Sequence, residues 1–212
     1  TLNTSTGDIS GTPTAITSSA VYTITATNSG GTDTTTITIV VNDALPIISY
    51  SQTSYTLTKD VAMTASTPTV NGGAVVTWSI SPSLPTGLTF ETSNGTIWGT
   101  PTAITSSASY TVSATNTGGT DTVAITIVVN DAAPTDLDYS PNTFTLTKGT
   151  QMTTVTPTAN GGTIVSFSVS PSLPAGLSLD TSTGAISGTP TAVTSSASYT
   201  ITATNTGGTD TA

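Results

Sequence analysis

The chain has 212 residues, enough for about two domains, with 2 basic and 11 acidic side chains and a formal net charge of −9. It has no histidine and no cysteine, so the side chains that perform most acid–base, nucleophilic and metal chemistry are missing, which argues against an enzyme. The only basic side chains are Lys59 and Lys148, which argues against a nucleic-acid partner and against an anionic membrane surface.

The first predicted strands lie in residues 1–43, where apolar residues alternate with threonine. Tyr22, Ile24 and Ala26 form one alternating run, and residues 36–41 form a second. A period of two is typical of a strand with one buried face. No apolar run here or later in the chain approaches the roughly 20 residues of a membrane span, so we expect no membrane insertion.

The stretch from residue 44 to residue 131 contains about seven further runs, with a short extra run at Ile97–Trp98. Turn sequences rich in asparagine and glycine separate them, and both residues accept positive φ. Seven or so short strands in fewer than 100 residues are typical of a two-sheet β-sandwich. The seven runs are centred near Ile48, Tyr55, Ala62, Val75, Leu88, Tyr110 and Ile125.

Internal repetition sets the predicted domain organisation. The pentapeptide Gly-Thr-Pro-Thr-Ala at 11–15 recurs at 99–103 and 188–192, at offsets of 88 and 89 residues. The one-residue difference lies just after Asp43 and Asp131, and length variation collects in connections. We therefore predict the C-terminal half of a repeat in 1–43, a complete repeat in 44–131, and a repeat without its last strand in 132–212.

Large apolar residues of each repeat make up its predicted core. Trp78 and Phe167 occupy equivalent positions, and an aromatic in both copies indicates a core anchor. The other predicted core residues are Leu84, Leu88, Phe90, Tyr110, Val112, Ile125 and Ile127 in the second repeat, and Leu173, Leu177, Leu179, Tyr199 and Ile201 in the third.

Two long motifs resemble a known family. Residues 81–90 (SPSLPTGLTF) with 92–101 (TSNGTIWGTP), and residues 173–177 (LPAGL) through 188–190 (GTP), resemble the signature of immunoglobulin-like repeats of bacterial surface and secreted proteins. The resemblance covers nearly all of the chain. It implies tandem immunoglobulin-like β-sandwiches, located outside the cell or on its surface, with no catalytic residues. Trp98 departs from the small residue usual before that glycine, such as Ser187.

The junctions between repeats contain the candidate metal ligands. They are similar to the linkers of cadherin-like domains, in which carboxylates of two neighbours hold Ca²⁺. A Ca²⁺ ion takes 6 to 8 oxygen ligands, whereas each junction brings one Asp and one Asn, so the alternative is that these residues cap a strand and turn the chain. No other cofactor is expected. The candidate ligands are Asn42, Asp43, Asn130, Asp131, Asp136 and Asp138.

A third set of acidic residues, Asp33, Asp121 and Asp210, follows each Gly-Gly-Thr turn. Because the same residue recurs at the same place, we expect its side chain to hydrogen-bond the backbone of its own turn.

These observations favour a structural function. Sandwiches joined by short, proline-bearing linkers would form a semi-rigid stalk or fibre, roughly 30 to 40 Å per repeat. Its partners would be neighbouring repeats or identical subunits, and two ways of completing the partial repeats stay open: covalent neighbours in an array, or strand exchange into filaments. The alternative function is an adhesin or carbohydrate-binding module that uses loops at one end of the sandwich. Most aromatics lie in strand patterns, and Trp98 is the exception.

Overall fold

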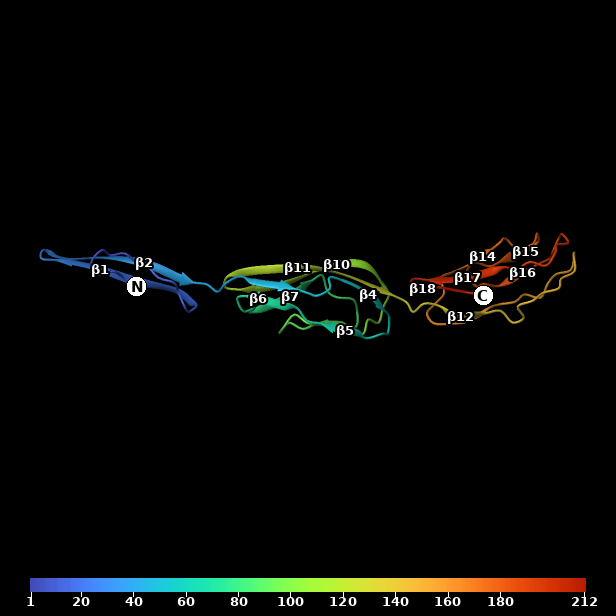
Figure 1. The fold of residues 1–212 in the computed structure, drawn as a ribbon, viewed down its shortest axis with the longest axis horizontal. Helices are drawn as coiled ribbons and strands as arrows, with labels where there is room; N and C mark the ends of the chain where they lie inside the picture. Colours follow the sequence, from blue (N-terminus) through green and yellow to red (C-terminus); the bar gives the residue numbers. More distant parts are fainter.

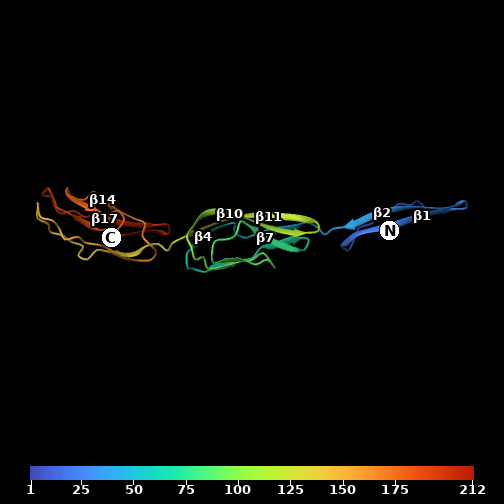
Figure 2. The same cartoon turned by 180° about the vertical axis from the view of Figure 1, so that it is seen from behind.

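The computed structural model describes residues 1–212, and all eighteen of its regular elements are β-strands. The strands form three groups that follow one another along the long axis of the molecule: β1 and β2, then β3 to β11, then β12 to β18 (Figures 1 and 2). The structure has no helix with the length and apolar character needed to cross a bilayer. The all-β prediction is therefore confirmed.

The first group is a single antiparallel hairpin. Strand β1 (Thr17–Asn28) pairs with β2 (Gly31–Val41), with Tyr22 opposite Ile37. Neither strand has a second partner in the structure. Because no other sheet covers its apolar face, Tyr22 is 49% exposed.

The middle group is a sandwich. One layer is a four-stranded sheet of order β4-β11-β10-β7, in which β4 runs parallel to β11 and the other pairs are antiparallel. Facing it are a three-stranded sheet of order β5-β9-β8 and the β3-β6 pair. The strands are β3 (Pro46–Ser49), β4 (Ser54–Thr58), β5 (Met63–Ser66), β6 (Thr69–Gly72), β7 (Thr77–Ser81), β8 (Leu88–Phe90), β9 (Ile97–Gly99), β10 (Thr105–Asn116) and β11 (Gly119–Asn130).

Eleven buried residues form the core of this middle sandwich. Ile97 reaches it from one layer, and Val112 and Ile125 reach it from the other, each with no exposed surface. Trp78 is buried among them. All eight residues predicted for this core either belong to the cluster or pack against it.

The third group repeats most of this plan. Strands β14, β17 and β18 form one sheet, and β12-β13 and β15-β16 form two pairs. Phe167 and Ile201 are buried in a separate cluster of eight residues, whereas Tyr199 is half-buried and lies outside it. The strands are β12 (Thr135–Asp138), β13 (Thr158–Asn160), β14 (Ser166–Ser170), β15 (Leu177–Leu179), β16 (Ile186–Gly188), β17 (Thr200–Asn205) and β18 (Gly208–Thr211).

One buried tyrosine in each sandwich ties distant segments together. The hydroxyl of Tyr50, after β3, donates to the carbonyl oxygen of Gly95, and that of Tyr139, after β12, donates to the carbonyl oxygen of Gly184. Burial raises the pKa of both hydroxyls, that of Tyr139 to about 12. Both tyrosines are thus held neutral, as a buried hydroxyl donor requires.

One detail of the strand predictions is wrong. The runs predicted near Ala62 and Val75 correspond to β5 and β7, which begin at Met63 and Thr77. Strand β6 (Thr69–Gly72), however, includes Asn71 and Gly72, which the pattern assigned to a turn between two paired strands. Strand β6 pairs with β3 rather than with β7. The pattern fails here because β6 is exposed along its whole length and shows no alternation.

Candidate functional site

The two junctions between groups are built around the same hairpin turn, Asn-Thr-Gly-Gly-Thr-Asp. We call residues 116–121 and 205–210 the junction turns. The first joins β10 to β11, and the second joins β17 to β18. In the first, the side-chain oxygen of Asn116 accepts the backbone N–H groups of Gly118 and Gly119, at 2.7 and 3.2 Å. The same bonds recur from Asn205, so each turn is fixed by its own asparagine.

Each junction turn also holds the chain where it enters the same sandwich. In the first, Asn116 Nδ2 donates to the carbonyl oxygens of Ala44 (2.7 Å) and Ala74 (3.2 Å). Thr117 Oγ1 accepts the backbone N–H of Asp43 at 3.0 Å. The entering segment is therefore bonded through its backbone, and side chains of the turn supply the partners.

The second junction repeats this pattern almost atom for atom. Asn205 Nδ2 donates to the carbonyl oxygen of Ala132 at 2.6 Å, and Thr206 Oγ1 accepts the backbone N–H of Asp131 at 2.9 Å. The sequence pattern drew attention to the acidic residues of these turns but not to Asn116, Thr117 and their equivalents. The signal for them was present, because the whole hexapeptide recurs.

The acidic residues of the turns reach further than expected. Asp121 Oδ2 accepts the backbone N–H of Ile48 in β3 at 2.8 Å, and Asp210 accepts that of Leu137 in β12 at 2.7 Å. Only Asp33, in the first hairpin, bonds its neighbour, the N–H of Thr34. The prediction that all three serve their own turn is therefore wrong for two of them. The reason is that the entering strand lies beside the turn in both sandwiches.

Glycine is required in the turn because the linker backbone passes directly over it. A Cβ on Gly118 would collide with the carbonyl oxygen of Asp43, and a Cβ on Gly207 would collide with that of Asp131. Any side chain there would push the linker away and break the bonds described above.

The second junction has no free residue between its two sandwiches. Lys59, after β4, donates its backbone N–H to the carbonyl oxygen of Asn130 at 2.8 Å, which ties that residue to the middle sandwich. The next residue, Asp131, is bonded to the last sandwich through Thr206. Adjacent residues are thus held by different domains.

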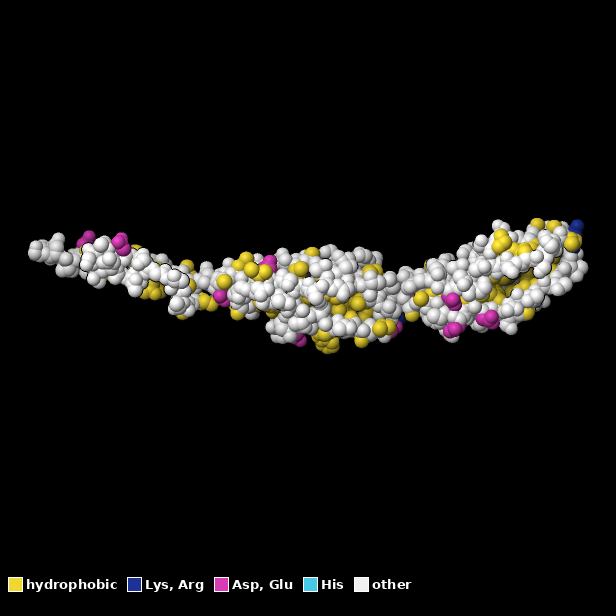
Figure 3. Space-filling view, viewed as in Figure 1, with side chains coloured by type: hydrophobic (Ala, Val, Ile, Leu, Met, Phe, Trp, Pro, Cys, Tyr) yellow, Lys and Arg dark blue, Asp and Glu magenta, His cyan; other side chains and the backbone are white.

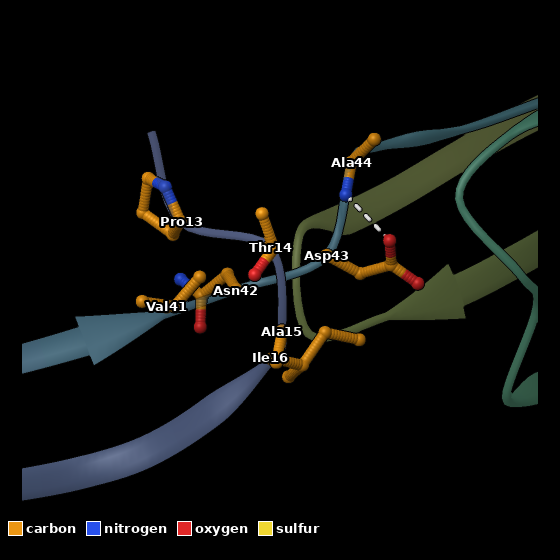
Figure 4. A pocket seen from close by; sticks show the side chains of 8 residues that line it. All are labelled: Pro13, Thr14, Ala15, Ile16, Val41, Asn42, Asp43 and Ala44. Carbon is orange, nitrogen blue, oxygen red and sulfur yellow. Dashed lines mark hydrogen bonds between the residues drawn. The ribbon is translucent and has the colours of Figure 1, made fainter. Parts of the chain in front are cut away.

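The first junction is more open. A pocket of about 230 Å³ lies between residues 13–16 and residues 41–44, where Figure 4 shows the bond from Ala44 to the Asp43 carboxylate. In the middle sandwich the turn after β4 fills the equivalent place, because Asp60 donates its N–H to the carbonyl oxygen of Pro101.

Three of the four carboxylates proposed as calcium ligands, those of Asp43, Asp131 and Asp136, already accept hydrogen bonds from the protein. Asp43 Oδ1 accepts the N–H of Ala44, while the two oxygens of Asp131 accept those of Ala132 and Thr163. The carboxylate of Asp136 accepts a hydrogen bond from the side-chain amide of Asn160. The backbone of Asp136 has a positive φ of 56°. The backbone of Asp138 pairs with that of Thr158.

These residues supply few of the oxygen atoms that a calcium cage needs. Asn42 and Asn130 bring one side-chain amide oxygen each, and no three or more acidic side chains gather anywhere in the structure. A Ca²⁺ ion needs 6 to 8 oxygens, usually with several carboxylates. The arrangement favours the alternative in which Asn-Asp turns the chain, and calcium binding stays a prediction to be tested.

The chain matches one known protein family and is similar to bacterial surface proteins. Residues 44–130 and 133–212 match the family described as "Putative Ig domain", which confirms the predicted family and the tandem immunoglobulin-like sandwiches. The chain is also similar to the "Serine-rich adhesin for platelets" of Staphylococcus aureus, strains MRSA252 and USA300, with 33% identity over 126 residues. That region is 59% of this chain but 9% and 6% of those two proteins, so the chain spans a small part of their length.

The chain is also similar to two solved structures. An I-band fragment from titin is 16% identical, with a TM-score of 0.45, and the match covers 91% of this chain and 72% of that one. Drosophila OTK, extracellular domains 3–5, is 16% identical with a TM-score of 0.42, covering 78% and 59%.

Proposed function

The chain belongs to the "Putative Ig domain" family, and from this we propose that it is a non-catalytic spacer. In this role it forms part of a stalk or fibre of a bacterial surface or secreted protein. The similarity to a staphylococcal adhesin supports a location outside the cell or on its surface. The end-to-end order of the three groups supports the extended shape (Figure 1).

The observation that carries this proposal is the second junction. Because Asn130 is bonded to one sandwich and Asp131 to the next, no residue is free to act as a swivel. A linker held in this way transmits orientation and force from one domain to the next, whereas a flexible linker lets domains tumble. The first junction shares the half of this arrangement that bonds Asp43 and Ala44 to the following sandwich.

Small-angle X-ray scattering of the 212-residue chain tests the spacer role. We expect a rod whose largest dimension is on the order of 100 Å, from 30 to 40 Å per sandwich. The variant Thr206→Val removes the acceptor of the Asp131 N–H. It should widen the range of angles that the last two domains adopt relative to each other, measured by residual dipolar couplings. Thr209→Val, an exposed threonine of the same hairpin with no side-chain bond in the structure, is the matched control. A compact particle would refute the proposal.

A second candidate function is assembly by strand exchange, and a specific observation supports it. In the middle sandwich β4 pairs with residues 126–130 of β11, whereas the equivalent segment 143–147 is unpaired, with Phe144 39% exposed. Residues 36–42, which begin in β2 and end one residue after it, match 124–130 at every position but the first. We propose that β2 of one copy can pair with 143–147 of another, in competition with covalent neighbours in an array.

Sedimentation velocity over a range of protein concentrations tests the exchange. Filaments should form as the concentration rises, and Ile39→Lys should prevent them, because it places a charge on the face that would enter the acceptor. Thr38→Lys, on the opposite face of the same strand, is the matched control and should leave assembly unchanged. A monomer at all concentrations would leave covalent neighbours as the source of the missing pairing.

A further inference from the structure

Trp98 is an exposed indole in the centre of a small sheet. It lies in β9, the middle strand of β5-β9-β8, and 47% of its surface is exposed. Thr89 of β8 is its direct partner in the register, so both side chains lie on the same face. On the other side, exposed Thr64 and Ala65 lie between the two paired positions of β5. Figure 3 shows apolar side chains projecting from the middle domain on the side where β5 runs.

The fold does not need this indole. The equivalent strand of the last sandwich, β16, forms with Ser187 at that position. Within β9, Ile97 supplies the fully buried contact, while Trp98 points outward. Four other aromatic residues of the middle sandwich, Tyr50, Tyr55, Trp78 and Tyr110, are buried in its core. An exposed indole at a position where serine suffices points to a ligand rather than to packing.

The surroundings of Trp98 define what that ligand is. Strands β5, β8 and β9 carry no charged residue, in a chain whose net charge is −9. The one charged residue next to them is Glu91, directly after β8, and its carboxylate accepts hydrogen bonds from Ser93. Hydroxyl groups surround the indole instead: those of Thr64 and Thr89, and the bonded pair Thr67 and Thr96, 3.0 Å apart. An apolar ring beside hydroxyl donors and acceptors matches a molecule that has apolar C–H faces and a hydroxyl rim.

We propose that the face centred on Trp98 binds a neutral oligosaccharide of pyranose rings. One sugar ring stacks on the indole, and its hydroxyl groups exchange hydrogen bonds with Thr89 and Thr64. The site lies on the side of the sandwich, away from the end loops to which the sequence assigned an adhesive function. It is also independent of the spacer role, because no junction residue takes part.

Tryptophan fluorescence tests the proposal directly. Trp78→Phe, which installs the residue of the last sandwich, leaves Trp98 as the only tryptophan. Cellohexaose, a neutral chain with flat ring faces, should then change the Trp98 emission in a saturable way. In the native background Trp98→Ser, also the residue of the last sandwich, should weaken binding measured by calorimetry at least about tenfold. Thr89→Val, which keeps the shape without the hydroxyl, should weaken it about threefold.

Several results would overturn this inference. Emission from the Trp78→Phe variant that does not respond to cellohexaose, or equal binding by the Trp98→Ser variant, would remove the indole from any sugar site. An emission shift that follows protein concentration instead of sugar concentration would identify a second copy of the chain as the occupant. Unchanged thermal unfolding of the Trp98→Ser variant shows that the loss of binding is not a loss of fold. Failure here leaves the scattering test of the spacer unaffected.

Discussion

The middle and last sandwiches contain an identical hexapeptide, Thr-Ser-Ser-Ala-Ser-Tyr, which forms part of a β-strand in the first but not in the second. At 105–110 it is the first half of β10, whereas at 194–199 it forms no strand. In the middle sandwich it pairs with residues 125–129 of β11, and these residues have no counterpart within 132–212. The same difference separates β4 from the unpaired segment 143–147. Alternation therefore marks a segment that can be a strand, and pairing decides whether it is one.

The first hairpin shows that burial, too, depends on a second layer. Tyr22 and Tyr110 occupy equivalent positions in two hairpins of nearly the same sequence, yet Tyr22 is 49% exposed and Tyr110 6% exposed. The hairpin forms alone because its pairing is local, but its apolar face is covered only where a second layer exists. Local pairing and burial are thus separable in this chain.

The largest expected effect separates these two hairpins. Ile125→Ala removes a fully buried side chain from the middle core and should lower the free energy of unfolding of that sandwich by about 2 to 5 kcal/mol. Ile37→Ala, at the equivalent half-buried position of the first hairpin, should leave the same transition unchanged within about 0.5 kcal/mol. Urea unfolding followed by tryptophan emission reports the middle sandwich alone, since both tryptophans lie in it. An equal loss of unfolding free energy in the two variants would contradict the conclusion that only the second hairpin has its apolar face covered.

A smaller effect is expected at the junction turns. Asn116→Ala leaves the carbonyl groups of Ala44 and Ala74 without a donor and should destabilise the middle sandwich by about 1 to 3 kcal/mol. Asn28 occupies the same place in the first hairpin, where its side chain bonds only Gly30, so Asn28→Ala is the control. Chemical unfolding of the two variants checks this, and a loss from Asn28→Ala as large as that from Asn116→Ala would show that the entering chain is irrelevant.

Much of this molecule could be predicted from its sequence, and the exceptions share one cause. The hairpins β1-β2 and β10-β11 follow from local alternation around a glycine-bearing turn, and the repeat offsets fix which residues are equivalent. The partner of Asp121 could not be predicted, because Ile48 lies 73 positions away along the chain. The exposed strand β6 was missed for the same reason, as only its pairing with β3 makes it a strand. Strand β6 has no buried side chain, so its long-range pairing leaves no alternation in the sequence.

The packing of the two sandwiches differs along one edge. In the last sandwich a groove of about 400 Å³ lies between β14 and β15, lined by Phe167, Val169 and Leu179 among others. The equivalent residues of the middle sandwich, Trp78, Ile80 and Phe90, are all larger. Reciprocal substitution should therefore act with opposite signs: Phe90→Leu destabilises the middle sandwich by about 1 kcal/mol, and Leu179→Phe stabilises the last by a similar amount. Calorimetric unfolding midpoints check both, and a loss from both would mean that the groove cannot accept a larger ring.

The smallest expected effect is that of calcium on the unfolding midpoint. The two junctions differ in the number of acidic residues that could bind the ion. Asp136 and Asp138 give the second junction two acidic residues that the first lacks, so any calcium site would favour the second. A ligand at about 100 times its dissociation constant raises the free energy of unfolding by about 2.7 kcal/mol. Extracellular modules bind Ca²⁺ at about 10⁻⁴ to 10⁻³ M, so about 10 mM Ca²⁺ would reveal such a site by scanning calorimetry. Because the carboxylate of Asp131 already accepts two backbone N–H groups, we expect the same unfolding midpoint in calcium and in EDTA. A rise in calcium that Asp138→Asn abolishes would establish the site and assign the stiffness of that junction to the ion rather than to Thr206.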